Sequence, residues 1–153
     1  MNQIAAIVKE IEKTEVVTYI RVEIGEATLC LIKPKSPEWL SVGDKVTCTF
    51  QETSVCVSKE CPGKVSIENR LPATLKEVRR GASLCELTFE SDLGEVISLI
   101  TSHAYDTLGL SKGCEATMLL RGLDVNVEPI LTPIDLDAYC KVLEGSTRTK
   151  VAN

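Results

Sequence analysis

The sequence predicts an all-β protein made of two tandem five-stranded barrels, each with a short helix, followed by a short C-terminal helix. Three features of the 153-residue chain support this fold class. Apolar and polar residues alternate in many short runs, a pattern typical of half-buried strands. Aromatic residues make up only 4% of the chain, so the core must be built from Val, Ile, Leu and Ala. The pattern of the first half also recurs in the second half, at a period of roughly 68 residues.

The first half contains five expected strands. They cover residues 2–11, 16–24, 27–32, 45–50 and 54–58. Ile4, Ile7 and Ile11 are the candidate core positions of the first strand. Gly25-Glu26 marks a hairpin between the second and third strands, and prolines bound an irregular loop before the fourth.

The second half repeats this order. Residues 69–78 and 83–90 form the first two strands, Gly94 opens the third, and residues 118–125 form the last part. A helix of one or two turns is expected at residues 104–110. Asn69 aligns with Asn2, and Gly94-Glu95 aligns with Gly25-Glu26. Five short strands with a helix between two of them favour an OB-like barrel.

The duplication also sets the expected domain boundaries. We predict a first module at residues 1–60, a second module at residues 61–130, and a C-terminal helix and tail at residues 131–153. The link at residues 58–64 is short and contains Pro-Gly, so the two modules should touch. Residues 135–143 place Leu136, Tyr139, Cys140 and Leu143 on one helical face.

Composition excludes several classes of protein. The net charge is −5 and no basic stripe appears, so we expect no direct nucleic-acid binding. Residues 1–15 carry acids where a signal peptide needs an apolar run, and no window approaches a membrane span, so we expect a cytoplasmic protein. The seven cysteines lack a CxxC spacing and are expected to be reduced, with Cys30, Cys48, Cys56 and Cys85 inside strands.

Four short motifs of the second half suggest a family. They are Asn69-Arg70-Leu71-Pro72, Ile100-Thr101-x-x-Ala104, Leu108-Gly109-Leu110-x-x-Gly113 and Arg121-Gly122-x-Asp124-Val125. Together with the duplication, they resemble the Mop/TOBE (molybdenum-pterin-binding) domain family. The likeness is to the two-module molbindins or to the C-terminal region of molybdate-responsive regulators. The resemblance implies paired barrels that share strands, a homo-oligomer from dimer to hexamer, and molybdate or tungstate bound at module or subunit interfaces.

The resemblance also implies a set of oxyanion-binding residues. A tetrahedral dianion needs backbone N–H groups, hydroxyl groups and a basic side chain. The second module supplies Ser66, Asn69, Arg70, Thr101, Ser102 and Arg121, and the first supplies Asn2, Lys33, Lys35, Ser36 and Thr53. Several positions depart from the family pattern. Glu68 replaces a basic residue, Gln51-Glu52 replaces the closing lysine and its neighbour, Leu123 replaces a hydroxyl residue and Lys33 replaces a threonine. A carboxylate beside a dianion is repulsive, so those sites are altered or lost unless the acids turn away.

Two other functions are alternatives to oxyanion binding. The barrels could form a ligand-free interaction or oligomerisation module that partners a regulator or a transporter ATPase, with exposed strand edges and the C-terminal helix as docking surfaces. An enzyme is not expected, because the sequence shows no nucleophile elbow, metal cluster or phosphate loop. His103 is the only histidine, and a structural role suits it better than a metal or acid–base role.

Overall fold

The computed structural model describes residues 1–130, and the expected C-terminal helix lies outside those residues. The first half runs through strands β1 to β5 and one 3-10 turn. In chain order these are β1 (Asn2–Lys13), β2 (Thr18–Ile24), β3 (Ala27–Lys33), β4 (Lys45–Phe50), η1 (Glu52–Ser54) and β5 (Cys56–Ser58). The second half follows the same order with one added helix: β6 (Asn69–Arg80), β7 (Leu84–Ser91), β8 (Gly94–Thr101), α1 (Ser102–Leu108), β9 (Glu115–Leu120), η2 (Gly122–Asp124) and β10 (Asn126–Pro129).

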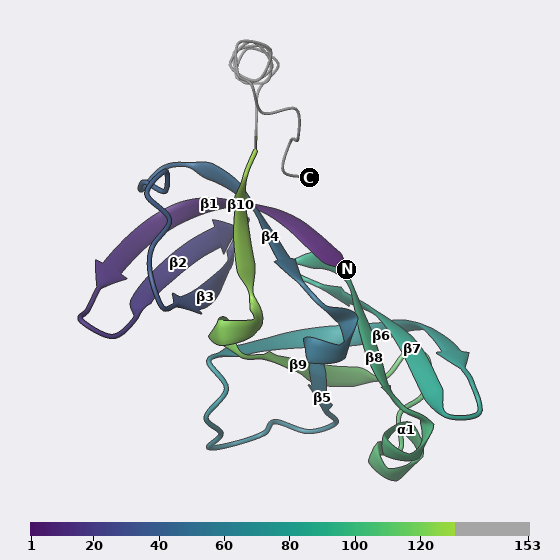
Figure 1. Ribbon diagram of the computed structural model, residues 1–153. Helices are drawn as coiled ribbons and strands as arrows, with labels where there is room; N and C mark the ends of the chain where they lie inside the picture. Colours follow the sequence, from purple (N-terminus) through teal and green to yellow (C-terminus); the bar gives the residue numbers. More distant parts are fainter. Residues whose placement is uncertain (131–153) are drawn as a thin grey trace, which may run out of the picture.

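These strands form two five-stranded sheets that exchange their edge strands (Figure 1). One sheet has the order β10-β4-β1-β2-β3, and the other has the order β5-β9-β6-β7-β8. β10 pairs antiparallel with β4, with Asn126 opposite Thr49, and β5 pairs antiparallel with β9, with Cys56 opposite Leu119. Each sheet therefore takes its fifth strand from the other half of the chain. The predicted all-β class with two five-stranded units is confirmed.

The duplication is visible in burial as well as in strand order. β1 and β6 show the same sequence of buried and exposed side chains over all twelve residues. Ile4 is buried as expected, but Ile7 is 40% exposed, because residues three apart in a strand face opposite sides. A register shift between Val8 and Glu10 then lets Ile11 pack against the core.

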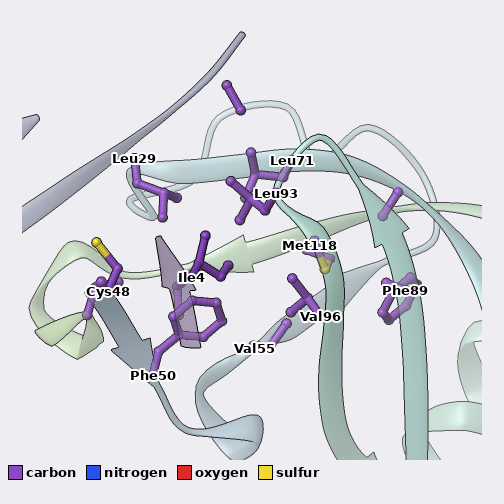
Figure 2. Packing of buried hydrophobic residues seen from close by; sticks show 14 of the residues in the cluster. Ile4, Leu29, Cys48, Phe50, Val55, Leu71, Phe89, Leu93, Val96 and Met118 are labelled. Carbon is purple, nitrogen blue, oxygen red and sulfur yellow. The ribbon is translucent and has the colours of Figure 1, made fainter. Parts of the chain in front are cut away.

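A single apolar cluster spans both halves (Figure 2). Ile4 and Phe50 from the first half lie in the same cluster as Val96 and Met118 from the second half, with Val55 between them in the view. Phe50 and Phe89 are its largest fully buried side chains. The two halves therefore share one core, and their burial contributes to stability jointly.

The structure differs from the sequence-based expectation at the helices. Within residues 1–130, α1 is the only α-helix, and the first half has an irregular loop between β3 and β4 instead. Pro34 and Pro37 lie in that loop, where each lacks a backbone N–H and disfavours helix in the residue before it. In place of the strand expected at residues 54–58, a 3-10 turn precedes a three-residue strand. No helix among the described residues is long and apolar enough to cross a membrane.

Candidate functional site

Each 3-10 turn packs against the third strand of the other half of the chain. η2 packs on β3, and η1 packs on β8. Each turn follows an extended residue, Gln51 before η1 and Arg121 before η2. Every site built around these turns therefore combines residues from both halves.

Two asparagines hold this crossed arrangement together. The Asn69 side chain accepts a hydrogen bond from the Cys30 backbone N–H (2.8 Å) and donates one to the Cys30 carbonyl (2.9 Å). Asn2 makes the same pair of bonds with the backbone of Ile97, both at 2.9 Å. Both asparagines are buried. From the sequence, both side chains are expected to bind an oxyanion. In the structure their amide groups instead satisfy backbone N–H and C=O groups, one residue in β3 and one in β8.

Gly122 marks the closest approach of η2 to β3. A Cβ atom added there would lie 2.9 Å from the Cys30 carbonyl oxygen and 3.0 Å from Ile32 Cγ1. The Gly122 N–H donates to Glu68 Oε1 at 2.8 Å. Glu68 directly precedes Asn69, the first residue of β6. These two successive side chains therefore bind η2 and β3 respectively.

Replacing Gly122 with Ala is expected to lower the free energy of unfolding by about 1–3 kcal/mol, because the new methyl group has a backbone oxygen in its way. Urea unfolding followed by circular dichroism measures the change. Leu123→Ala is the control, since Leu123 on the same turn is 58% exposed and should lose well under 1 kcal/mol. Equal stability of the Gly122 variant and the wild type would contradict the tight packing.

A small cavity lies between the two turns. Its volume is about 140 Å³, and its lining residues are Thr53, Ser54, Cys56, Ile67, Leu119, Arg121 and Asp124. Organic ligands of drug size need about 300–1,000 Å³, whereas one water occupies about 30 Å³ of liquid. The cavity therefore suits a small polyatomic ion and excludes a large cofactor.

Basic side chains from both halves lie around η2. Arg121 Nε donates to Asp124 Oδ2 at 2.9 Å, which uses one of the five guanidinium donors. Lys33 Nζ donates to Asn126 Oδ1 at 2.8 Å, just beyond the same turn. Burial lowers the pKa of Lys33, and the nearby Asp124 carboxylate opposes that effect. Lys33 and Arg121 thus belong to one charged group, although the sequence places them in different modules.

The other expected donors occupy different surroundings. Thr101 Oγ1 accepts from the Ala104 N–H and caps α1, and buried Ser102 donates to the Gly81 carbonyl. Arg70 donates to the Gly63 carbonyl, and Ser36 donates to the Pro37 carbonyl. Ser66 and Lys35 are exposed. Of the eleven expected residues, Thr53 and Arg121 line the cavity, and Lys33 is near enough to the cavity-lining Asp124 for that carboxylate to act on its pKa.

Several relevant residues escape prediction from the sequence. Ser54, Cys56 and Asp124 line the cavity, and the Arg-x-x-Asp spacing is the one signal that pointed to Asp124.

Cys56 is exposed instead of buried, because β5 is a three-residue edge strand. Glu52 turns to the Met1 amine at 2.6 Å, and that hydrogen bond lowers the Glu52 pKa. This pairing offsets one of the acids that depart from the family pattern.

Comparison with family models decides the family. The model described as TOBE domain matches residues 1–57 and again residues 65–121. The chain belongs to the TOBE domain family. The first TOBE match ends inside β5, after the chain has crossed to the other sheet, and the second ends at Arg121, before the chain crosses to β10.

A solved structure shares the arrangement of the two TOBE modules. A crystal structure of the cytoplasmic molybdate-binding protein ModG, in a form with molybdate bound, superposes with a TM-score of 0.79 at 23% sequence identity. The match covers 84% of this chain and 96% of that chain. Comparison with curated proteins gives no match. At this identity, the ModG likeness establishes the fold of the tandem TOBE modules.

Proposed function

We propose that this protein is a cytoplasmic binding protein for molybdate or tungstate that acts in storage, homeostasis or sensing. The observation that supports this most is the cavity between η1 and η2, where Arg121 and Thr53 face a space of oxyanion size. The similar fold of ModG, which holds molybdate in a crystal, supports the same ligand class. The proposed activity is binding and release, without catalysis.

The chemistry of the cavity fits a tetrahedral oxyanion. Arginine presents a planar fork of N–H donors that matches two oxygens of such an anion, and a charge-assisted bond is roughly twice as strong as a neutral one. The Thr53 hydroxyl supplies a further donor from the opposite half. Lys33 adds positive charge near Asp124, whose carboxylate acts to raise the Lys33 pKa. Selection then depends on the size and charge of the anion.

Further sites between subunits are part of the proposal. Ser66 and Lys35 are exposed and remain proposed donors at such interfaces, in a homo-oligomer between a dimer and a hexamer. Sedimentation with and without tungstate would measure whether the ligand and the assembly are linked.

Replacing Arg121 with Ala is expected to weaken tungstate binding by about 10- to 100-fold, because a hydrogen bond to a charged group is worth about 1.5–3 kcal/mol. Titration calorimetry with molybdate, tungstate and sulfate measures the affinities. The control is Arg79→Ala, which removes an 81% exposed arginine paired with Glu86 on the outer surface. Wild-type affinity in the Arg121 variant would remove this cavity as the site.

A ligand-free interaction module is the second candidate function. The carboxylate of Glu68 on the Gly122 N–H and the pairing of Arg121 with Asp124 favour it, since both reduce the donors left for an anion. In that case the protein would dock on a regulator or a transporter ATPase. Absence of heat and of any shift in melting temperature with millimolar oxyanions would favour this function over the first.

A further inference from the structure

The Glu68 carboxylate binds a residue adjacent to the lining of the cavity between η1 and η2. Its chain neighbour Ile67 lines the cavity, and so does Arg121, the chain neighbour of Gly122. Glu68 Oε1 accepts the Gly122 N–H at 2.8 Å. Both ends of this hydrogen bond, Glu68 and Gly122, are therefore chain neighbours of cavity-lining residues, and neighbouring Cα atoms are about 3.8 Å apart.

The charges around η2 balance when Glu68 is counted. Lys33 and Arg121 are positive, while Asp124 and Glu68 are negative. Asp124 is held by Arg121 at 2.9 Å, whereas Glu68 is held by the uncharged Gly122 N–H. The field of Glu68 extends to β3, because it adds to burial in raising the pKa of Cys30. Glu68 is therefore the negative charge of this group that lacks a direct ion pair in the described contacts.

We propose that Glu68 determines the charge selectivity of the Arg121–Thr53 cavity, lowering its affinity for tetrahedral dianions more than for monoanions of the same shape. This inference rests on the proposed oxyanion-binding function and deepens it. The repulsion between Glu68 and a bound anion grows in proportion to the charge of the anion. A dianion therefore loses twice as much binding free energy to Glu68 as a monoanion in the same position.

The test compares tungstate with perrhenate, a tetrahedral monoanion of similar size, on wild-type protein and on Glu68→Gln. The glutamine oxygen still accepts from the Gly122 N–H, so the variant removes the charge and keeps the contact. We expect the variant to bind tungstate about tenfold more tightly and perrhenate about threefold more tightly, because the repulsion scales with charge. Titration calorimetry at low ionic strength gives all four affinities.

Glu26→Gln is the matched control. It removes the same charge from the exposed turn between β2 and β3, several residues along the strand from Cys30. Charges separated by more than about 8–10 Å are screened, so this variant should change either affinity by less than about twofold. A change equal to that of Glu68→Gln would show an effect of net charge alone and would overturn the proposal.

The remaining outcomes separate the two proposals. If wild-type protein binds tungstate and Glu68→Gln binds both anions as the wild type does, charge selectivity by Glu68 is wrong and the binding function stands. If folded wild type and folded variant both fail to bind, both proposals fall. Should Glu68→Gln lose its fold, the Gly122 amide resonance of the wild type provides the second measurement. It should shift with tungstate at the same midpoint as the Arg121 Nε signal, and an unaffected Gly122 amide would overturn the proposal.

Discussion

Replacing Asn69 with Ala is expected to lower the free energy of unfolding by about 2–5 kcal/mol. The substitution removes two hydrogen bonds to the Cys30 backbone and leaves its N–H and carbonyl without their side-chain partner. Each buried polar group left unsatisfied costs about 1–3 kcal/mol, which is more than a surface hydrogen bond contributes. Urea unfolding, followed by circular dichroism and by the fluorescence of Trp39, measures the loss.

The matched control is Asn126→Ala. Asn126 is an exposed asparagine whose side chain accepts from Lys33, so its removal should cost less than about 1 kcal/mol. Asn2→Ala should resemble the Asn69 variant, since Asn2 makes the same two bonds to Ile97. An Asn69 variant as stable as the Asn126 variant would show that the Asn69 contact with Cys30 does not hold the two halves together.

Separating the two halves of the chain is expected to abolish folding of each half as a monomer. A fragment of residues 1–64 keeps β4 without β10, keeps β5 without β9, and exposes the apolar cluster that the two halves share. A domain of roughly 60 residues is marginal even with a complete core. Circular dichroism and sedimentation should show an unfolded monomer, or a folded dimer in which two copies exchange β5.

Two further samples test whether the two halves depend on each other to fold. Mixing the fragments of residues 1–64 and 65–153 should restore the fold of the full chain. A full chain cut only within the 59–64 linker should stay folded and associated, because strand exchange and the asparagine contacts persist without the linker. A folded monomer of residues 1–64 would contradict the shared core.

Much of this fold can be predicted from the sequence because its signals are local. Alternation of apolar residues predicts β1 from Asn2, and the recurrence of that pattern at Asn69 predicts the second unit. The matched asparagines prove equivalent in structure, since both pair with a third strand. At these two asparagines the sequence pattern predicts the structural equivalence correctly, because both positions have the same backbone geometry.

The strand exchange could not be predicted in this way. β5 and β10 are short and exposed, and their residue pattern is compatible with either sheet. The alignment at the hairpins is also different from the one expected. The second two-residue turn consists of Asp92 and Leu93, so Gly94 pairs with Ser91 and corresponds to Ala27, not to Gly25. The match between Gly25 and Gly94 gave a wrong alignment, because glycine is accepted both within the turn and directly after it.

The candidate site was predictable only in its chemistry. Arg121 and Thr53 are expected donors and do line one cavity, but their association across the two modules depends on the exchange. Asn2 and Asn69 have side chains suited to an anion, yet they bind backbone groups that only the folded chain brings near them. Residue type thus indicated what each group can bind, and topology decided which partner it meets.

The exchange of β10 has a consequence for synthesis on the ribosome. Asn2 forms a hydrogen bond with Ile97, 95 positions along the chain, and β4 pairs with β10 at the far end of the described residues. Chains are made at about 5–20 residues per second, and contacts between distant residues slow folding. The first sheet therefore stays incomplete with an open edge until residues 126–129 have emerged, so this protein should be most vulnerable to aggregation and proteolysis as a nascent chain.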